Sequence, residues 1–119
     1  MEKVANTRFE DTKVWQDAVE LAVAIYKMTK SFPADELYAM TSQMRRAATS
    51  ISANIAEGYG RVSKKDKVHF YTISYGSLME LKSFIYLSQK VGLSSNVETS
   101  LELVDTIQRQ INAIRISLK

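Results

Sequence analysis

One stretch of the chain, residues 41–60 (TSQMRRAATSISANIAEGYG), consists almost entirely of small side chains, and it constrains the fold more than any other stretch. Apolar residues recur in it at helical spacing: Met44, Ala47, Ala48, Ile51 and Ile55. A helix with so much Ala, Ser and Thr lets neighbouring helices come close to its backbone. The stretch therefore predicts the central helix of a helical bundle.

Helix breakers are scarce, with one proline at position 33 and four glycines among 119 residues. Four segments show apolar steps of three and four residues, and no segment has the alternation of a strand. The helices are expected over residues 12–31, from either 34 or 41 to about 60, over 63–91 and over 95–119. Short connections imply antiparallel neighbours. We therefore predict an all-α fold, an antiparallel up-down-up-down four-helix bundle in which residues 1–119 form a single domain. Residues 1–11 are polar and are expected to form a flexible N-terminal arm.

Capping signals mark several predicted helix ends. The first helix should be capped by Asp11 or Thr12. A left-handed glycine should end the second and third helices, and capping boxes should begin the third and fourth. The expected glycine is Gly58 or Gly60 for the second helix and Gly92 for the third. The expected capping boxes are residues 63–66 (SKKD) for the third helix and residues 95–98 (SNVE) for the fourth.

The third predicted helix is apolar on nearly every side, which a helix on the outside of a small bundle would not need. Its apolar residues form more than one row, and one of these rows consists of Tyr71, Leu78, Leu81 and Ile85. A single core cannot cover all of them. The remaining apolar residues suggest an oligomer interface, because aromatic side chains are enriched at such interfaces. The candidates are Tyr75, Met79, Phe84 and Tyr86. The alternative is that these side chains lie half-exposed at the rim of the bundle.

Positive charge is concentrated in one quarter of the chain. The net charge is +3, and residues 41–69 alone carry six basic and two acidic residues. The basic residues are the candidate nucleic-acid-binding set: Arg45, Arg46, Arg61, Lys64, Lys65 and Lys67. Such a set can contact phosphates, with nearby tyrosines stacking on bases. The alternative is that these residues form a solvated charged face. Separately, Glu57 could be buried and paired with Arg45 or Arg46 of this or a neighbouring subunit.

No constellation of residues suited to catalysis or metal binding emerges. The chain has no cysteine, its single histidine lies in Asp66-x-x-His69, and its hydroxyl residues have no nearby base. We therefore expect that the protein is not an enzyme and that it has no catalytic residues, no metal and no cofactor. No apolar run reaches the length of a signal peptide or a membrane span. A cytoplasmic protein without membrane contact is the expectation.

The motifs of residues 41–65 resemble the four-helix-bundle protein family encoded in bacterial 23S rRNA intervening sequences, some members of which are labelled ribosomal protein-like. The motifs are TSQ at 41–43, RRAA at 45–48, SANIAEG at 52–58 and KK at 64–65. Ala53 stands where the family usually has proline. The resemblance implies a ring-like homopentamer. It also implies a relation to accessory proteins of diversity-generating retroelements, which are pentamers that bind nucleic acid and a reverse transcriptase.

Together the charge pattern and the resemblance favour a non-enzymatic oligomeric protein of essentially unknown role. We expect it to bind RNA or other nucleic acid through a basic surface. The alternative is an oligomeric scaffold that docks a protein partner and has no nucleic-acid role.

Overall fold

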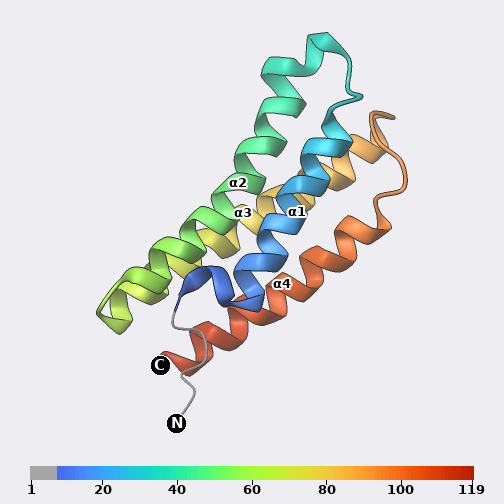
Figure 1. Cartoon of the computed structure of the whole chain (residues 1–119). Coiled ribbons are helices and arrows are strands. Elements are labelled where there is room, and N and C mark those ends of the chain that lie inside the picture. Colours follow the sequence, from blue (N-terminus) through green and yellow to red (C-terminus); the bar gives the residue numbers. More distant parts are fainter. Residues whose placement is uncertain (1–7) are drawn as a thin grey trace.

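Four α-helices account for most of the described chain, residues 8–119 of a computed structural model (Figure 1). They are α1 (Lys13–Thr29), α2 (Ser42–Gly60), α3 (Lys64–Lys90) and α4 (Glu98–Ser117), with short helical turns η1 (Phe9–Asp11), η2 (Ala34–Glu36) and η3 (Leu37–Thr41). Consecutive helices run in opposite directions, and α2 and α4 each pack on both α1 and α3. The predicted all-α four-helix bundle is confirmed, and no strand occurs within residues 8–119.

A short turn leads into α1. The Phe9 and Trp15 rings meet edge to face, with centroids 5.2 Å apart. Thr12 is the N-cap, because its side chain accepts a hydrogen bond from the Trp15 amide. The rest of the predicted N-terminal arm, residues 1–7, lies outside the described residues, so the arm stays a prediction.

The connection from α1 to α2 contains two irregular turns. Pro33 precedes the 3-10 turn η2, as expected for a residue that fixes its own φ and cannot donate a backbone hydrogen bond. The wider turn η3 follows, with a kink at Ala39 (φ −120°, ψ −106°). Regular helix begins at Ser42, so the later of the two predicted starts for α2 matches the α-helix proper.

Besides the N-cap of α1, two further predicted helix ends are confirmed. Ser63 caps α3, because its hydroxyl accepts a hydrogen bond 3.1 Å long from the Asp66 amide. Gly92 follows α3 with φ +84°, the left-handed conformation that glycine adopts without strain. The next amide, that of Leu93, donates to the Ser88 carbonyl at 2.8 Å, which completes a Schellman motif.

The other two predicted ends are wrong. Gly58 and Gly60 are helical and are followed by extended Arg61, so no left-handed glycine ends α2. At α4 the N-cap is Val97 and no side chain caps the helix. The Val97 side chain is 1% exposed, and Asn96 takes a left-handed conformation (φ +54°) immediately before it. Burial of Val97 therefore fixes how the chain enters α4, in place of the predicted capping box.

The helices α2 and α3 form the most extensive contact in the bundle, and small polar residues lie within it. The fully buried Ser74 hydroxyl donates to the Ile51 carbonyl at 2.9 Å. The Ser50 and Ser77 hydroxyls are 2.8 Å apart. Small side chains thus allow one helix to bond the backbone of the other, as the composition of residues 41–60 predicts.

Gly58 lies at a close approach of α2 to α3. A Cβ atom at Gly58 would lie 3.2 Å from the Phe70 Cβ and 3.3 Å from the Tyr71 ring. Because the Phe70 Cβ is fixed to the α3 backbone, it cannot move without moving that helix. A side chain at position 58 would therefore push α2 away from α3.

Alanine substitutions at Gly58 and Gly76 should have different effects on stability. Both glycines are helical, but a Cβ at Gly76 meets nothing within 4 Å. Gly76→Ala should raise the free energy of unfolding by about 0.5–1 kcal/mol through helix propensity. Gly58→Ala should lose that gain to the clash, and Gly58→Val should destabilise the protein further. Urea denaturation measures both, and an equal gain from the two alanines would contradict the close contact.

Candidate nucleic-acid interface

Arg45, one of the six predicted nucleic-acid-binding residues, is bound within the bundle. Its Nε donates to the Thr29 hydroxyl at 2.9 Å, and its guanidinium lies 4.6 Å from the centre of the Tyr26 ring. Both partners belong to α1, so Arg45 ties α2 to α1. Its neighbour Arg46 points to the exposed side of α2.

Lys67 replaces the expected glycine cap of α2. Its ammonium donates to the Tyr59 carbonyl at 2.8 Å and to the Gly58 carbonyl at 3.3 Å. It also lies 5.7 Å from the centre of the Tyr59 ring. A cation suits the negative end of a helix dipole. Lys67 therefore satisfies the last carbonyls of α2 from the neighbouring helix.

Arg61 also has partners within the chain. Its guanidinium lies 2.7 Å from the Glu57 carboxylate and stacks on the Phe70 ring at 4.6 Å. Glu57 is exposed, so its suggested burial beside Arg45 or Arg46 of the same chain is wrong. The short separation explains the difference, because Glu57 lies in the last turn of α2 and Arg61 directly follows the helix, within reach of the Glu57 carboxylate. Pairing with these arginines of a neighbouring subunit stays a prediction.

Lys64 and Lys65 differ from these three residues. They are the first two residues of α3 and both are exposed. Among the ion pairs within residues 8–119, none includes either lysine. Their charges add to the positive end of the α3 dipole, partly offset by Asp66. Together with Arg46, they are the predicted cations available to a partner.

A basic hollow that sequence reasoning missed lies between the first turns of α3 and the end of α4. It encloses about 430 Å³ and is lined by Val68, Thr72, Asn112, Arg115, Ile116 and Lys119. Lys65 lies seven residues before Thr72 and thus on the same side of α3. We call Lys64, Lys65, Arg115 and Lys119 the α3–α4 basic surface.

Three contacts hold Arg115 in this surface. Its guanidinium lies 4.4 Å from the centre of the Tyr75 ring, and it donates to the Asn112 side chain at 2.6 Å. A third, longer contact of 3.4 Å reaches the Thr72 hydroxyl. These neutral partners leave the positive charge of Arg115 uncompensated while restricting its motion.

The four predicted interface residues of α3 lie in different surroundings. Tyr75, Met79 and Phe84 are partly buried against the bundle's own core, and the Tyr75 hydroxyl accepts a hydrogen bond from Gln108. Tyr86 is 48% exposed. Other apolar side chains of α3 are exposed on the side toward α2: Ile73, Leu87 and Val91. Their interface role stays a prediction.

The described part of the chain shows neither a cluster of metal-ligating side chains nor a membrane-spanning helix. His69 is exposed and lies edge to face with Phe70, and no group of three His, Cys, Asp or Glu side chains gathers there. Within residues 8–119, no helix has both the length and the apolar character that crossing a membrane requires.

The comparisons with known proteins concern most of the chain. A family model described as 23S rRNA-intervening sequence protein matches residues 10–113. The chain is also similar to a solved structure, a Bacteroides thetaiotaomicron protein of unknown function from the S23 ribosomal protein family. The TM-score is 0.62 at 24% identity, over 88% of this chain and 94% of that one, and this likeness shows the fold. No curated protein matches the chain.

Lys67→Met should lower the free energy of unfolding by about 1 kcal/mol, because it leaves two carbonyls at the end of α2 without their charged donor. Lys65→Met is the matched control and should change stability by less than about 0.5 kcal/mol. Chemical denaturation of both variants measures the difference. Equal stability would show that Lys67 does not cap α2.

Stability should fall as pH rises above about 10. Burial of the Tyr71 phenol, with a smaller effect from nearby Tyr59, raises the pKa of Tyr71 above its ordinary value. Above pH 10 the unfolded chain therefore releases a proton that the folded chain retains, which favours unfolding. Denaturation at pH 8–11 should show a weaker decline for Tyr71→Phe than for the unmodified protein. Tyr38→Phe, at a site 92% exposed, should leave the decline unchanged.

Proposed function

This chain belongs to the 23S rRNA-intervening sequence protein family, and we propose that it is a non-enzymatic oligomer that binds RNA. The observation that carries this proposal is the α3–α4 basic surface, whose three lysines take part in none of the ion pairs of residues 8–119. Binding would involve the phosphate backbone, independently of base sequence.

The surroundings of the α3–α4 basic surface suit a nucleic-acid backbone. Thr72 and Asn112 place a hydroxyl and an amide beside the cations, and both groups commonly bond phosphate or sugar oxygens. Ile116 is 65% exposed next to them and could contact a sugar or a base. The arrangement thus combines steering by charge with short-range polar contacts.

Oligomerisation would repeat this surface and raise its avidity. The exposed fractions of Ile73 (39%), Leu87 (46%) and Val91 (59%) support an interface on α3 that would cover them. We propose a homopentamer of a bacterial cytoplasm, related to the accessory proteins of diversity-generating retroelements. The proposed interface includes Tyr75, Met79, Phe84 and Tyr86.

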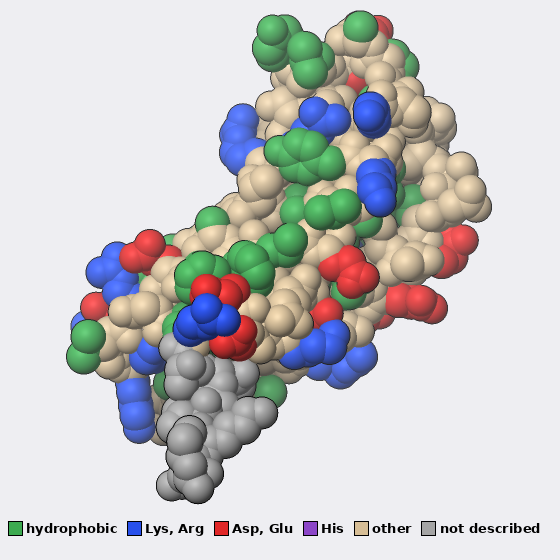
Figure 2. Space-filling model, viewed as in Figure 1, with side chains coloured by type: hydrophobic (Ala, Val, Ile, Leu, Met, Phe, Trp, Pro, Cys, Tyr) green, Lys and Arg blue, Asp and Glu red, His purple; other side chains and the backbone are tan. Residues whose placement is uncertain are grey.

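A second candidate function is a scaffold that docks a protein partner. Figure 2 shows hydrophobic side chains in a broken band along the face formed by α1 and α2, with Lys and Arg beside part of it. Val23 is 47% exposed and Tyr26 is 44% exposed on α1, and Tyr38 is 92% exposed before α2. This band favours a partner with an apolar contact surface.

Charge reversal should separate the two functions. Lys64→Glu with Lys65→Glu should weaken binding to an rRNA-like hairpin for all sequences alike, and should lower the salt slope, −d log K/d log[salt], by about 1.5–2. The matched control is the double variant Lys27→Glu with Lys90→Glu. It changes the net charge by the same amount, but its two substitutions lie near the C-terminal ends of α1 and α3. Binding assays at 50 and 200 mM salt measure both.

Several outcomes would contradict the proposal. They are no hairpin binding at low salt, binding indifferent to salt, and equal loss in the two double variants. A protein partner that survives nuclease treatment, combined with no hairpin binding, would favour the scaffold. Light scattering tests the oligomer separately, because a monomer at micromolar concentration would refute it.

A further inference from the structure

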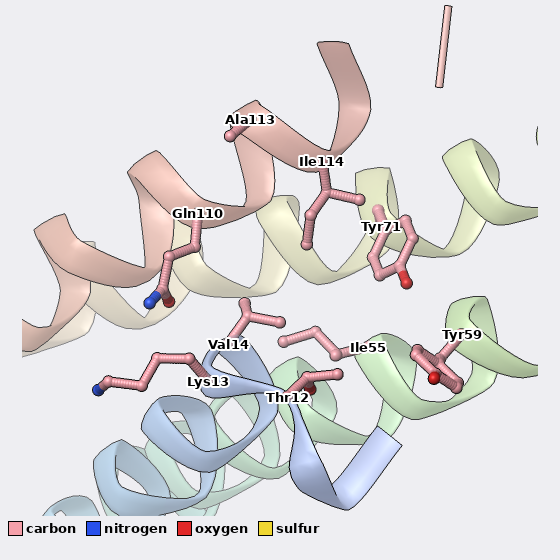
Figure 3. Close-up of a pocket in the computed structure, with 9 residues that line it drawn as sticks. All are labelled: Thr12, Lys13, Val14, Ile55, Tyr59, Tyr71, Gln110, Ala113 and Ile114. Carbon is pink, nitrogen blue, oxygen red and sulfur yellow. The ribbon is translucent and has the colours of Figure 1, made fainter. Parts of the chain in front are cut away.

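A mainly apolar cavity of about 410 Å³ lies at the end of the bundle where α1 begins, α2 ends and α4 ends (Figure 3). Val14, Ile55 and Ile114 form its apolar walls, and they come from α1, α2 and α4. A cavity of this size is in the range that proteins use for small molecules. It is separate from the α3–α4 basic surface, with which it shares no lining residue.

A buried hydrogen-bond acceptor without a partner lines this cavity. The Gln110 amide nitrogen donates to the Asp17 carboxylate at 3.0 Å. Asp17 is 4% exposed and its other oxygen pairs with Lys13. These contacts fix the amide, because rotating it would set oxygen against carboxylate oxygen. The Gln110 Oε1 atom is then buried without a partner among the described residues.

Such an acceptor is costly unless a donor reaches it. A buried polar atom without a hydrogen bond has lost its hydration with nothing in return, and native proteins contain few such atoms. Gln110 is therefore the polar group in this cavity most in need of a ligand. Figure 3 shows Tyr59 and Tyr71 at the other end of the cavity from Gln110, each with a phenol oxygen that can donate or accept.

We propose that this cavity binds a small, uncharged, flat molecule that carries an N–H or O–H donor. The donor bonds Gln110 Oε1, the apolar body lies between Val14, Ile55 and Ile114, and the far edge meets the two tyrosines. The nearby charges of Lys13 and Asp17 already neutralise each other. An ionic ligand would therefore lose its hydration without gaining a counter-charge. This site goes beyond the proposed RNA binding and does not depend on it.

A matched pair of probes tests the donor. Indole has a flat apolar body and one N–H, whereas 1-methylindole has the same body without the donor. Indole should bind in saturable fashion, with an affinity at least five-fold higher than that of 1-methylindole. Calorimetry or NMR titration of the full chain measures both affinities. Equal affinities, or no saturation by indole at its solubility limit, would overturn the proposal.

Matched variants test the location. Ala113→Phe adds a ring at the edge of the cavity and should reduce indole affinity at least ten-fold. The control is Ala53→Phe, at another exposed helical alanine, which should keep the affinity. Gln110→Met should make the two probes bind equally. If Gln110→Met does not fold, the alanine pair still decides, since unchanged affinity in Ala113→Phe would exclude this cavity.

Discussion

The close contact between α2 and α3 is the constraint on which the rest of the structure depends. Because Gly58 presents no side chain, the end of α2 lies directly against the start of α3. Lys67 is then near enough to bond the last carbonyls of α2. That single approach explains why no left-handed glycine is needed at this helix end. It also leaves α1 and α4 to close the other side of the core, where the cavity lies.

Contacts within the bundle divide the basic residues into two groups. Arg45, Arg61 and Lys67 each lie over an aromatic ring and also bond a group within the chain. These contacts contribute to the stability of the bundle. Lys64 and Lys65 precede the contact and remain exposed. The cluster of charge in the sequence therefore corresponds both to a structural network and to exposed lysines that belong to the proposed binding surface.

Sequence reasoning succeeded where structure is set by local periodicity. The apolar stripe predicted for residues 41–60 is buried in the core, including Met44, Ile51 and Ile55. The cap of α3 joins Ser63 to Asp66, which are only three residues apart, and was equally predictable. What was missed joins distant parts of the chain. The Arg115 contact with Thr72 spans 43 residues and the Gln110 contact with Asp17 spans 93, and neither spacing leaves a pattern in one sequence.

The end of α4 connects the two surfaces to which we assign binding. Ile114 faces the apolar cavity, and its neighbour Arg115 lines the α3–α4 hollow. Successive helical residues point about 100° apart, so an α4 packed between α1 and α3 presents one residue to each groove. The polar Gln110 lies one turn earlier, where it reaches Asp17 on α1. The order of residues on one helix thus follows from the antiparallel bundle, which gives α4 two neighbours and two grooves of different character.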